Sequence, residues 1–481
     1  MSSAPAQAQL KRFKVFVRWR PLSASESELP EIERKTVEND KDEEESSMSI
    51  SLDGPADPKT RKTRSWKSGA GSFTGVFEVG AGNQVVYREV VAPTLPLVLN
   101  GSTCTFFAYG HSGSGKTHTI VGYDYERDEN LGLFLGAARE LTVAIDELNA
   151  GFSEVEGQTH ANFGVGLRLY ELRRKSAFDL LNGHNECYIR EGPDGKTHIR
   201  GETEMLEDGK VRVRPIQTRA CWTFDQVRQH LLEGLQLRKT GSSTVHDQSS
   251  RTHAVLELEV VNSTLLEARN AVIERQSALV PVGKRATDIY LEEVTRSLIK
   301  NEDGTYRQNP DCRPNQARID AAEAEKCECE ARVAQAEADV SHVFASSLHS
   351  CLGGKFVFVD LAGSEYFEQG TGTSTLGPSP SPQERQEGRQ INTDLFGLKE
   401  VLRARALGLP RIPFRSAPLT MALREHFLGS KDSTSAMILT VSPSSQQFSA
   451  TTNTLKYGNL VGMASTDGSS KGSASATAVR S

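Results

Sequence analysis

The 481-residue chain lacks the features that mark secreted and membrane-spanning proteins. It has no charged and then apolar leader, and no apolar run approaches the 18 or so residues of a membrane span. Its seven cysteines are odd in number and scattered, so no disulfide framework is indicated. The net charge of −6 offers no overall attraction to an acidic polymer. We therefore expect a reduced, cytoplasmic protein that binds neither nucleic acid nor membrane.

Apolar residues are also scarce and make up only 37% of the chain. This content fits one large α/β domain with long polar insertions better than two or three average domains. The charged segment 36–72 is predicted to be an insertion that is largely loop, and segment 366–386, rich in Gly, Ser and Pro, a long loop. Residues 1–11 are predicted to be flexible and residues 463–481 to be a disordered tail. No heptad stalk follows, so no dimerisation region is seen.

Segment 263–354 is the longest insertion, and it is too long to be a structureless loop in a compact domain. Apolar residues near one face of Ala286–Lys300 predict a helix, and Asn301 to Gly304 predicts its end. The Ala- and Glu-rich stretch Arg318–Leu348 predicts a second helix. We expect a helical hairpin that projects from the core. A partner-binding role and a simple spacer both remain open.

The chain does contain a phosphate-binding pattern, in which an apolar, β-prone run at 103–109 leads into Gly110 to Thr117. Its glycines permit a tight turn that directs backbone N–H groups at phosphate oxygens. Lys116 can reach the β- and γ-phosphates, and the Thr117 hydroxyl can ligate Mg²⁺. A helix predicted from Thr117 to Val121 adds the positive end of its dipole. The pattern therefore predicts a nucleotide site.

Two further segments fit a nucleotide switch. The apolar run Lys355–Asp360 ends in an acid, where P-loop NTPases hold the Mg²⁺ shell, and Gly363 can offer its N–H to the γ-phosphate. Paired serines beside Arg251 precede a strand in which Val255, Glu257 and Glu259 alternate with apolar residues. The serines suit a loop that senses Mg²⁺ and the γ-phosphate. An ordinary polar turn is the alternative.

Taken together, these motifs resemble the motor domain of kinesins over most of residues 12–461. The resemblance implies a P-loop NTPase of the α/β class in residues 12–462, with a central, mostly parallel but mixed sheet and helices on both faces. The helical insertion 263–354 would join the strands beside the two switch regions. The matching segments are Val15–Pro21, Phe107–Thr119, Ser249–His253, Asp360–Glu365, Glu387–Leu398, Ile412–Thr420 and Ser442–Tyr457.

The resemblance also implies roles for individual residues. Thr117 and Ser250 would ligate Mg²⁺, with Asp360 holding it through water, and Arg18, Pro21 and His118 would contact the adenine of ATP. A salt bridge from Arg251 to Glu365 would close switch I onto switch II. The implied catalytic residues are Lys116, Ser249, Arg251, Gly363 and Glu365. The implied nucleotide-binding residues are Arg18, Arg20, Pro21, Gly110, His111, Ser112, Gly113, Ser114, Gly115, Lys116, Thr117 and His118.

The partner that the resemblance implies is the microtubule, and the location is the cytoplasmic cytoskeleton. Since the chain is acidic overall, binding would need a local basic patch. Each candidate taken alone is an ordinary solvated charge, and only its place in a kinesin motif singles it out. The candidates are Lys210, Arg212, Arg214, Arg389, Lys399, Arg403, Arg415 and Arg424.

Departures from the kinesin pattern leave the function open between alternatives. His246 stands where kinesins usually carry asparagine, and Pro418 stands where a lysine is usual. The first hypothesis is a microtubule-stimulated, Mg²⁺-dependent ATPase. A kinesin-fold microtubule binder with weak turnover is the second, and a P-loop switch unrelated to tubulin is the third. The segments 178–182 and 398–402 are similar to internal-motor kinesins that depolymerise microtubules, so a depolymerase is a further alternative.

Overall fold

The computed structural model describes residues 13–39, 47–56, 63–153, 162–192, 195–240, 251–302, 304–364, 382–428 and 433–477. Contacts divide the chain into two units. The first comprises Met1–Ile199, Ile216–Val260 and Ser350–Ser481, and the second comprises Arg200–Pro215 and Val261–His349. No helix in the described ranges is long and apolar enough to cross a membrane.

A mixed sheet forms the centre of the first unit, with strand order β9-β8-β7-β13-β16-β6-β17-β1-β5, and β12 pairs with β7. Strands β16, β6, β17, β1 and β5 are parallel, whereas β13 runs antiparallel to β16. The prediction of a mixed sheet is therefore confirmed, but the parallel pairing lies among the strands from β16 to β5, whereas β7 pairs antiparallel with β8 and β12, and β8 with β9. The strands are β1 (Lys14–Trp19), β5 (Gly75–Phe77), β6 (Thr103–Tyr109), β7 (Phe163–Arg173), β8 (Ser176–Asp179), β9 (Asn185–Glu191), β12 (Arg219–Cys221), β13 (His253–Asn262), β16 (Lys355–Asp360) and β17 (Thr434–Val441).

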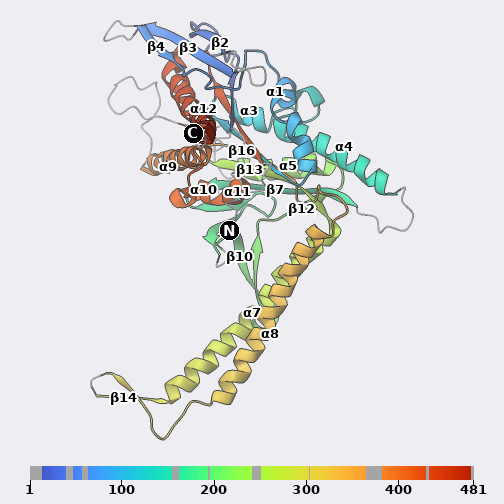
Figure 1. The fold of residues 1–481 in the computed structure, drawn as a ribbon, viewed down its shortest axis with the longest axis vertical. Coiled ribbons are helices and arrows are strands. Elements are labelled where there is room, and N and C mark those ends of the chain that lie inside the picture. The colour runs from blue at the N-terminus through green and yellow to red at the C-terminus, as the bar shows by residue number, and fades with distance from the viewer. Residues whose placement is uncertain are drawn as a thin grey trace. The chain divides into compact units, whose positions relative to one another are not determined.

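Helices cover both faces of this sheet. Figure 1 shows α9, α11 and α12 on one side and α1, α4 and α5 on the other. Strand β16 is a continuous apolar run because both of its faces are covered: Phe358 packs against Phe134 of α4, and Val357 and Val359 join the core with Leu398 of α9. The helices are α1 (Asn83–Val90), α2 (Leu95–Leu99), α3 (Lys116–Ile120), α4 (Leu133–Ser153), α5 (Phe224–Thr240), α9 (Pro382–Ala406), α10 (Pro418–Ala422), α11 (Arg424–Leu428) and α12 (Phe448–Thr477).

The segment predicted to be largely loop, 36–72, instead contributes to a second, antiparallel sheet of the first unit. It consists of β2 (Glu33–Asn39), β3 (Ser47–Ala56) and β4 (Thr63–Lys67). The prediction was wrong because it relied on the charged composition of the segment and not on the periodicity of its apolar residues. Met48, Ile50 and Leu52 alternate with small polar residues, and Ile50 and Leu52 are fully buried. The charged clusters at 40–46 and 57–62 lie outside the described residues.

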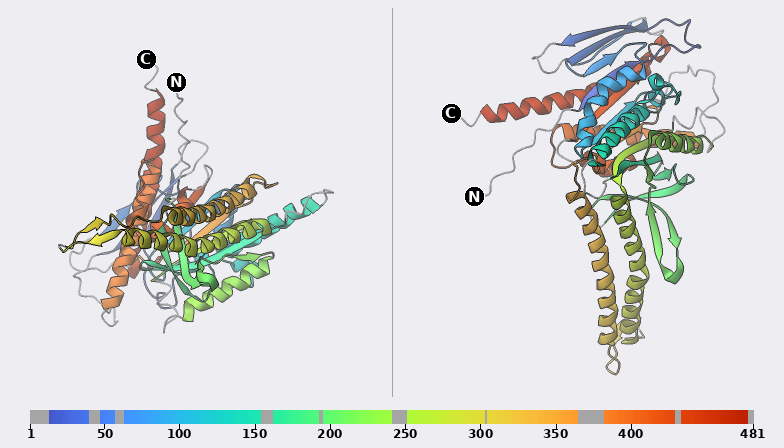
Figure 2. Two further views of the ribbon diagram at one scale, coloured as in Figure 1. Left: turned by 90° about the horizontal axis from the view of Figure 1, so that it is seen from below. Right: turned by 90° about the vertical axis from the view of Figure 1, so that its right-hand side faces the viewer.

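The second unit contains the predicted helical hairpin, but its helices have other bounds. Helices α7 (Ser263–Arg296) and α8 (Gln316–Ala345) lie side by side in both views of Figure 2. Helix α7 starts directly after β13, where the Asn262 side chain accepts a hydrogen bond from the Leu265 N–H. The predicted helix end is a short hairpin instead, formed by β14 (Leu298–Lys300) and β15 (Tyr306–Gln308). The unit also holds β11 (Val211–Pro215), which pairs with β10 (Thr197–Met205) and packs on α7.

Two further predictions need correction. The predicted long loop 366–386 ends earlier than expected, because α9 already begins at Pro382. Proline suits the first turn of a helix. Residues 365–381 lie outside the described ranges. The predicted disordered tail from residue 463 is replaced by a continuation of α12 to Thr477. No proline interrupts that stretch, and extending an existing helix is far easier than starting a new one.

Candidate nucleotide-binding site

The predicted strand, loop and helix around residues 103–120 are present as β6, a glycine-rich loop and α3. A Cβ atom at Gly110 would lie 2.3 Å from the carbonyl oxygen of Thr440, so only glycine fits against β17 there. Gly113 and Gly115 have φ angles of 72° and 104°, which other residues rarely adopt. Ser114 ties the loop to β17 through a 2.7 Å hydrogen bond between its hydroxyl and that of Thr440. The path of the loop is thus determined by its glycines.

Lys116 lies buried inside the curve of this loop. Its ammonium donates to the carbonyl oxygens of Gly110 and His111 at 3.0 and 2.9 Å. The His111 imidazole is also buried, with Nδ1 2.7 Å from the carbonyl oxygen of Ser112. Burial lowers the pKa of His111 to about 4, so its ring is neutral near pH 7. Lys116 is therefore the cation at the centre of the loop, and His111 is part of its packing.

Two of the predicted magnesium ligands meet at the end of the parallel strands. Because β16 pairs with β6, Asp360 lies beside Ala108 in the register and close to the start of α3. The Thr117 hydroxyl donates to Asp360 Oδ2 at 2.7 Å. Asp360 is 1% exposed, and its Oδ1 atom has no hydrogen-bond partner among the described residues. A hydroxyl and a carboxylate are hard oxygen ligands of the kind that Mg²⁺ prefers, so these residues fit the ion.

Sequence reasoning missed Arg238, a buried arginine of α5 that contacts the same carboxylate. Its guanidinium lies 3.3 Å from Asp360 Oδ2 and 3.6 Å from Glu171, and it is 5% exposed. A signal was present in the sequence: Arg238 follows Val227, Leu231 and Leu235 on the apolar stripe of its helix. A charged residue on such a stripe is buried, so it either pairs with buried groups of opposite charge or belongs to a functional site.

The glycine-rich loop opens onto a cavity of about 1060 Å³, large enough for a nucleotide. Arg18 lines it, but its guanidinium already donates to Asn83, Thr119 and the carbonyl of Ala81. Burial lowers the pKa of Arg18 to about 10, which leaves it charged at neutral pH. The predicted nucleotide-binding residues line this cavity with the exception of Gly110, which packs against β17 instead. Those that line it are Arg18, Arg20, Pro21, His111, Ser112, Gly113, Ser114, Gly115, Lys116, Thr117 and His118.

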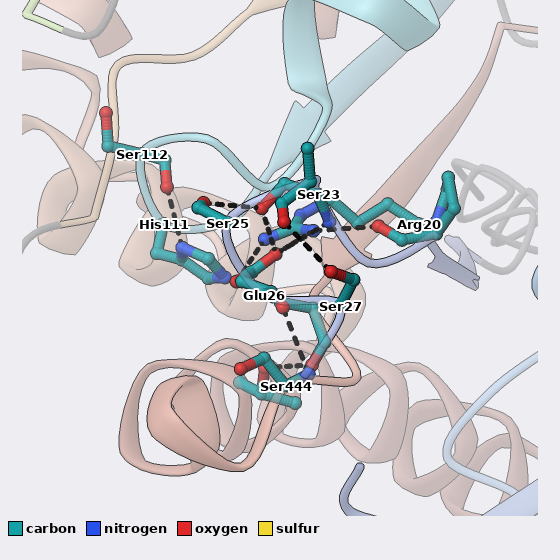
Figure 3. Close-up of polar contacts among 12 residues, drawn as sticks. Arg20, Ser23, Ser25, Glu26, Ser27, His111, Ser112 and Ser444 are labelled. Carbon is teal, nitrogen blue, oxygen red and sulfur yellow. Dashed lines mark hydrogen bonds and ion pairs between the residues drawn. The ribbon is translucent and has the colours of Figure 1, made fainter. Parts of the chain in front are cut away.

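Arg20, also predicted to bind nucleotide, is held by an acid in the loop that follows β1 (Figure 3). Its guanidinium forms two hydrogen bonds with Glu26, at 2.7 and 2.8 Å, and Glu26 also accepts from the backbone and hydroxyl of Ser23. The hydrogen bond from Arg20 is the main cause that lowers the pKa of Glu26 to about 2. The pair fixes the rim of the cavity beside the glycine-rich loop.

The switch residues are only partly described. Ser249, Ser250 and His246 lie in 241–250, and Glu365 lies in 365–381, so the predicted serine contacts and the Arg251–Glu365 salt bridge fall outside the described ranges. The loop after β16 does reach the glycine-rich loop, because the Ser364 N–H donates to the carbonyl of Gly110 at 3.1 Å. Because Ser364 follows Gly363 in the chain, this contact brings the backbone around Gly363 to the glycine-rich loop, where the phosphates are predicted to bind.

A buried histidine connects this loop to α9. His253 Nδ1 accepts a 3.0 Å hydrogen bond from the Ala362 N–H, while its Nε2 lies 3.7 Å from Asp394 of α9. Asp394 accepts a hydrogen bond from Gln390 at 3.1 Å. The N-terminal part of α9 is held separately, since Glu387 pairs with Arg173 at 2.9 Å. The ring of His253 therefore lies between the loop after β16 and α9.

The predicted basic patch is divided and partly neutralised. Lys210, Arg212 and Arg214 belong to the second unit, where Glu204 pairs with both arginines. In the first unit, one carboxylate, Glu191, binds two of the predicted arginines at distances from 2.6 to 3.3 Å. These are Arg415 and Arg424.

The other cations predicted for the first unit lie on α9. Arg389 and Arg403 are exposed there, and Lys399 lies over the ring of Phe396 at 4.7 Å. Phe396 is itself 59% exposed. The outer surface of α9 is therefore basic with an apolar centre.

Comparisons with known proteins agree with this geometry. The model of the kinesin motor domain family matches residues 18–282 and 331–463. The chain is 27% identical over 459 residues to Kinesin-like protein KIN-13A from Oryza sativa subsp. japonica, covering 95% of this chain and 42% of that protein. It is 24% identical over 457 residues to Kinesin-like protein KIF24 from Mus musculus, covering 94% and 24%. The chain thus spans less than half the length of these curated relatives.

Solved structures share the fold. A structure of mutants that reveal a signalling pathway for activation of the kinesin motor ATPase matches with a TM-score of 0.54 and 18% identity, covering 94% of this chain and 98% of that one. A structure of a fast kinesin matches with a TM-score of 0.53 and 17% identity, covering 95% and 92%. The gap between the two matched ranges of the family model, 283–330, falls within the helical hairpin of the second unit.

Proposed function

Because this chain belongs to the kinesin motor domain family, a family of microtubule-associated ATPases, we propose that it binds Mg-ATP in the cavity beside β6, hydrolyses it, and couples hydrolysis to movement along microtubules or to their remodelling. Its place of action would be the cytoplasmic cytoskeleton. The observation that carries this proposal is the meeting of Thr117 and Asp360 at 2.7 Å, beside the buried Lys116. Such an arrangement suits phosphoryl transfer by positioning and charge stabilisation.

Each residue of the site has a defined part in this proposal. Lys116 and the backbone N–H groups of the glycine-rich loop bind the phosphates, and Thr117 and Asp360 would hold Mg²⁺. When bound, Mg²⁺ would neutralise charge on the phosphate oxygens. Arg238 places a positive charge 3.3 Å from the buried carboxylate of Asp360. Gly363, adjacent to the Ser364 contact with the glycine-rich loop, is the proposed sensor of the γ-phosphate.

The roles of the two switch regions are proposed on the kinesin motifs. Ser249 and Ser250 would position the water and the metal, and Arg251 would pair with Glu365 when the site closes. Since His253 of β13 contacts both the loop after β16 and Asp394 of α9, closure has a short path to α9. The outer surface of α9, with Arg389, is the proposed microtubule contact.

Specific features favour two alternatives. His246, in place of the usual asparagine, favours a kinesin-fold microtubule binder with weak turnover, and Pro418 at the first position of α10 removes a usual lysine. The segments 178–182 and 398–402 favour a depolymerase. All three share the nucleotide site and the microtubule surface, and they differ in turnover and in the effect on the polymer.

The test is steady-state turnover of ATP and of GTP across a titration of microtubules, with Lys116→Ala as the blank. We expect a saturable rise of roughly tenfold or more with ATP, about 1.4 kcal/mol in activation free energy. A rate at the level of the blank, with microtubule co-sedimentation retained, would establish the weak-turnover binder. Loss of tubulin polymer during turnover would establish the depolymerase. Absence of any binding to microtubules would refute the proposal.

A further inference from the structure

An exposed tyrosine lies at the rim of the nucleotide cavity. Tyr123 is 65% exposed, and it alone among the large hydrophobic side chains left exposed in the described structure lines this cavity. Tyr123 lies only three residues beyond the end of α3, the helix that carries Thr117 and His118. An aromatic ring that lines a cavity offers an apolar face on which a flat base can pack.

The loop that carries Tyr123 is held in a defined shape. Gly122, with a φ angle of 83°, forms a bridge with Leu131 that closes the loop at its neck. Inside the loop, Asp124 accepts hydrogen bonds from two backbone N–H groups and, at 3.0 Å, from the side chain of Asn130. Tyr125 serves the same purpose, because its hydroxyl donates to the carbonyl of Gly122 at 3.2 Å. Tyr123 is therefore presented at the cavity by a pre-formed loop.

Tyr123 and His118 form a pair of aromatic rings. Their centroids are 5.8 Å apart and their planes are tilted by 49°, within the range of aromatic contacts. Both residues line the cavity, so the two rings lie together at its wall.

We infer that Tyr123 is a nucleotide-contacting residue, which forms with His118 the aromatic wall against which the base of a purine nucleoside triphosphate packs. This inference rests on the proposed nucleotide site and adds to it a residue outside the matching motifs. The phosphates are held by the glycine-rich loop, whereas Tyr123 reads the base. Its contribution should therefore depend on whether the ligand has a base at all.

The experiment compares two ligands, ATP and inorganic tripolyphosphate, by isothermal titration with Mg²⁺ present. The proteins are the wild type, Tyr123→Ala, Tyr123→Phe and, as the matched control for loss of an exposed tyrosine, Tyr306→Ala, whose side chain is 62% exposed and does not line the cavity. Stacking of a base on an aromatic ring predicts that Tyr123→Ala weakens ATP binding roughly fivefold to tenfold. Tripolyphosphate binding should stay within about twofold of the wild type. Tyr123→Phe, which keeps the ring, and Tyr306→Ala should bind both ligands as the wild type does.

Three results would overturn the inference. Unchanged ATP affinity in Tyr123→Ala would show that the ring does not contact the nucleotide. Equal losses for ATP and tripolyphosphate would show that it acts on the phosphate loop rather than the base. A wild type that binds neither ligand would refute the nucleotide site and this inference together, whereas the first two results leave the proposed function intact. Circular dichroism confirms that each variant is folded.

Discussion

Replacing Glu257 by glutamine should lower the free energy of unfolding by about 3 kcal/mol, at the lower end of the range for breaking a buried ion pair. Glu257 lies on the central strand β13 and is 3% exposed. It accepts a 3.1 Å hydrogen bond from the Tyr170 hydroxyl and lies 3.1 Å from Nε2 of His426. Arg168 and Lys355 are 3.5 and 3.8 Å away. Glutamine keeps the volume, so the loss measures the charge rather than a cavity.

The same variant should remove a dependence of stability on pH. Burial alone would raise the pKa of Glu257, but His426, Lys355 and Arg168 outweigh it and hold the pKa well below the unfolded value of 4.5. Because the unfolded chain then binds the proton more tightly, the stabilisation is complete above pH 4.5 and is lost as the pH falls from there towards the folded pKa. Glu257→Gln should therefore show a flatter fall in stability below that pH than the wild type.

Urea unfolding at a series of pH values measures both effects, and the chain contains a matched control. Glu233 lies 3.1 Å from His230, the same separation as in the Glu257–His426 pair, but Glu233 is exposed on α5. Solvent screening should limit the loss in Glu233→Gln to about 0.5 kcal/mol or less. Equal losses in the two variants, or an unchanged pH dependence in Glu257→Gln, would refute the argument that burial makes the difference.

Two other predictions concern the site and its surface. Gly110→Ala should abolish binding of a fluorescent ATP analogue, because the new Cβ meets the backbone of β17 at 2.3 Å. Gly113→Ala lies in open space but at a φ of 72°, so it should lower the free energy of unfolding by about 1 kcal/mol and still bind the analogue. Similar affinities in both variants would contradict the steric reasoning. Glu191→Ala should release Arg415 and Arg424 and tighten co-sedimentation with microtubules at low salt. Unchanged or weaker co-sedimentation would show that these arginines do not face the polymer.

The parts of the site that could be predicted are those built from adjacent residues. The glycine-rich loop needs glycine at Gly110, Gly113 and Gly115 for local reasons, so its pattern is visible in the sequence. Asp360 is visible because it ends an apolar run. Arg238 was missed because its role depends on Asp360, 122 residues away in the chain. The contact of Tyr123 with the cavity was missed for a similar reason, since nothing in its neighbours marks it.

Strand β13 shows why charge patterns are read less reliably than apolar ones. The alternation of Glu257 and Glu259 with apolar residues is typical of a strand with one buried face and one face exposed to solvent. The strand was predicted correctly, but both glutamates are buried. A central strand between β7 and β16 has no solvent-facing side once helices cover the sheet, so its polar residues must find partners inside.

Those partners come from places that no local pattern connects. Arg168 and Tyr170 belong to β7, Lys355 to β16 and His426 to α11. Each of these residues taken alone is an ordinary polar position, and only the folded sheet brings them to within 4 Å of Glu257. Because Glu257, Tyr170 or His426 left without its partners would be a buried, unpaired group, the network must be complete to be tolerated. It follows that single substitutions here should destabilise more than paired apolar replacements, and a double-mutant cycle on Glu257 and His426 would measure that coupling directly.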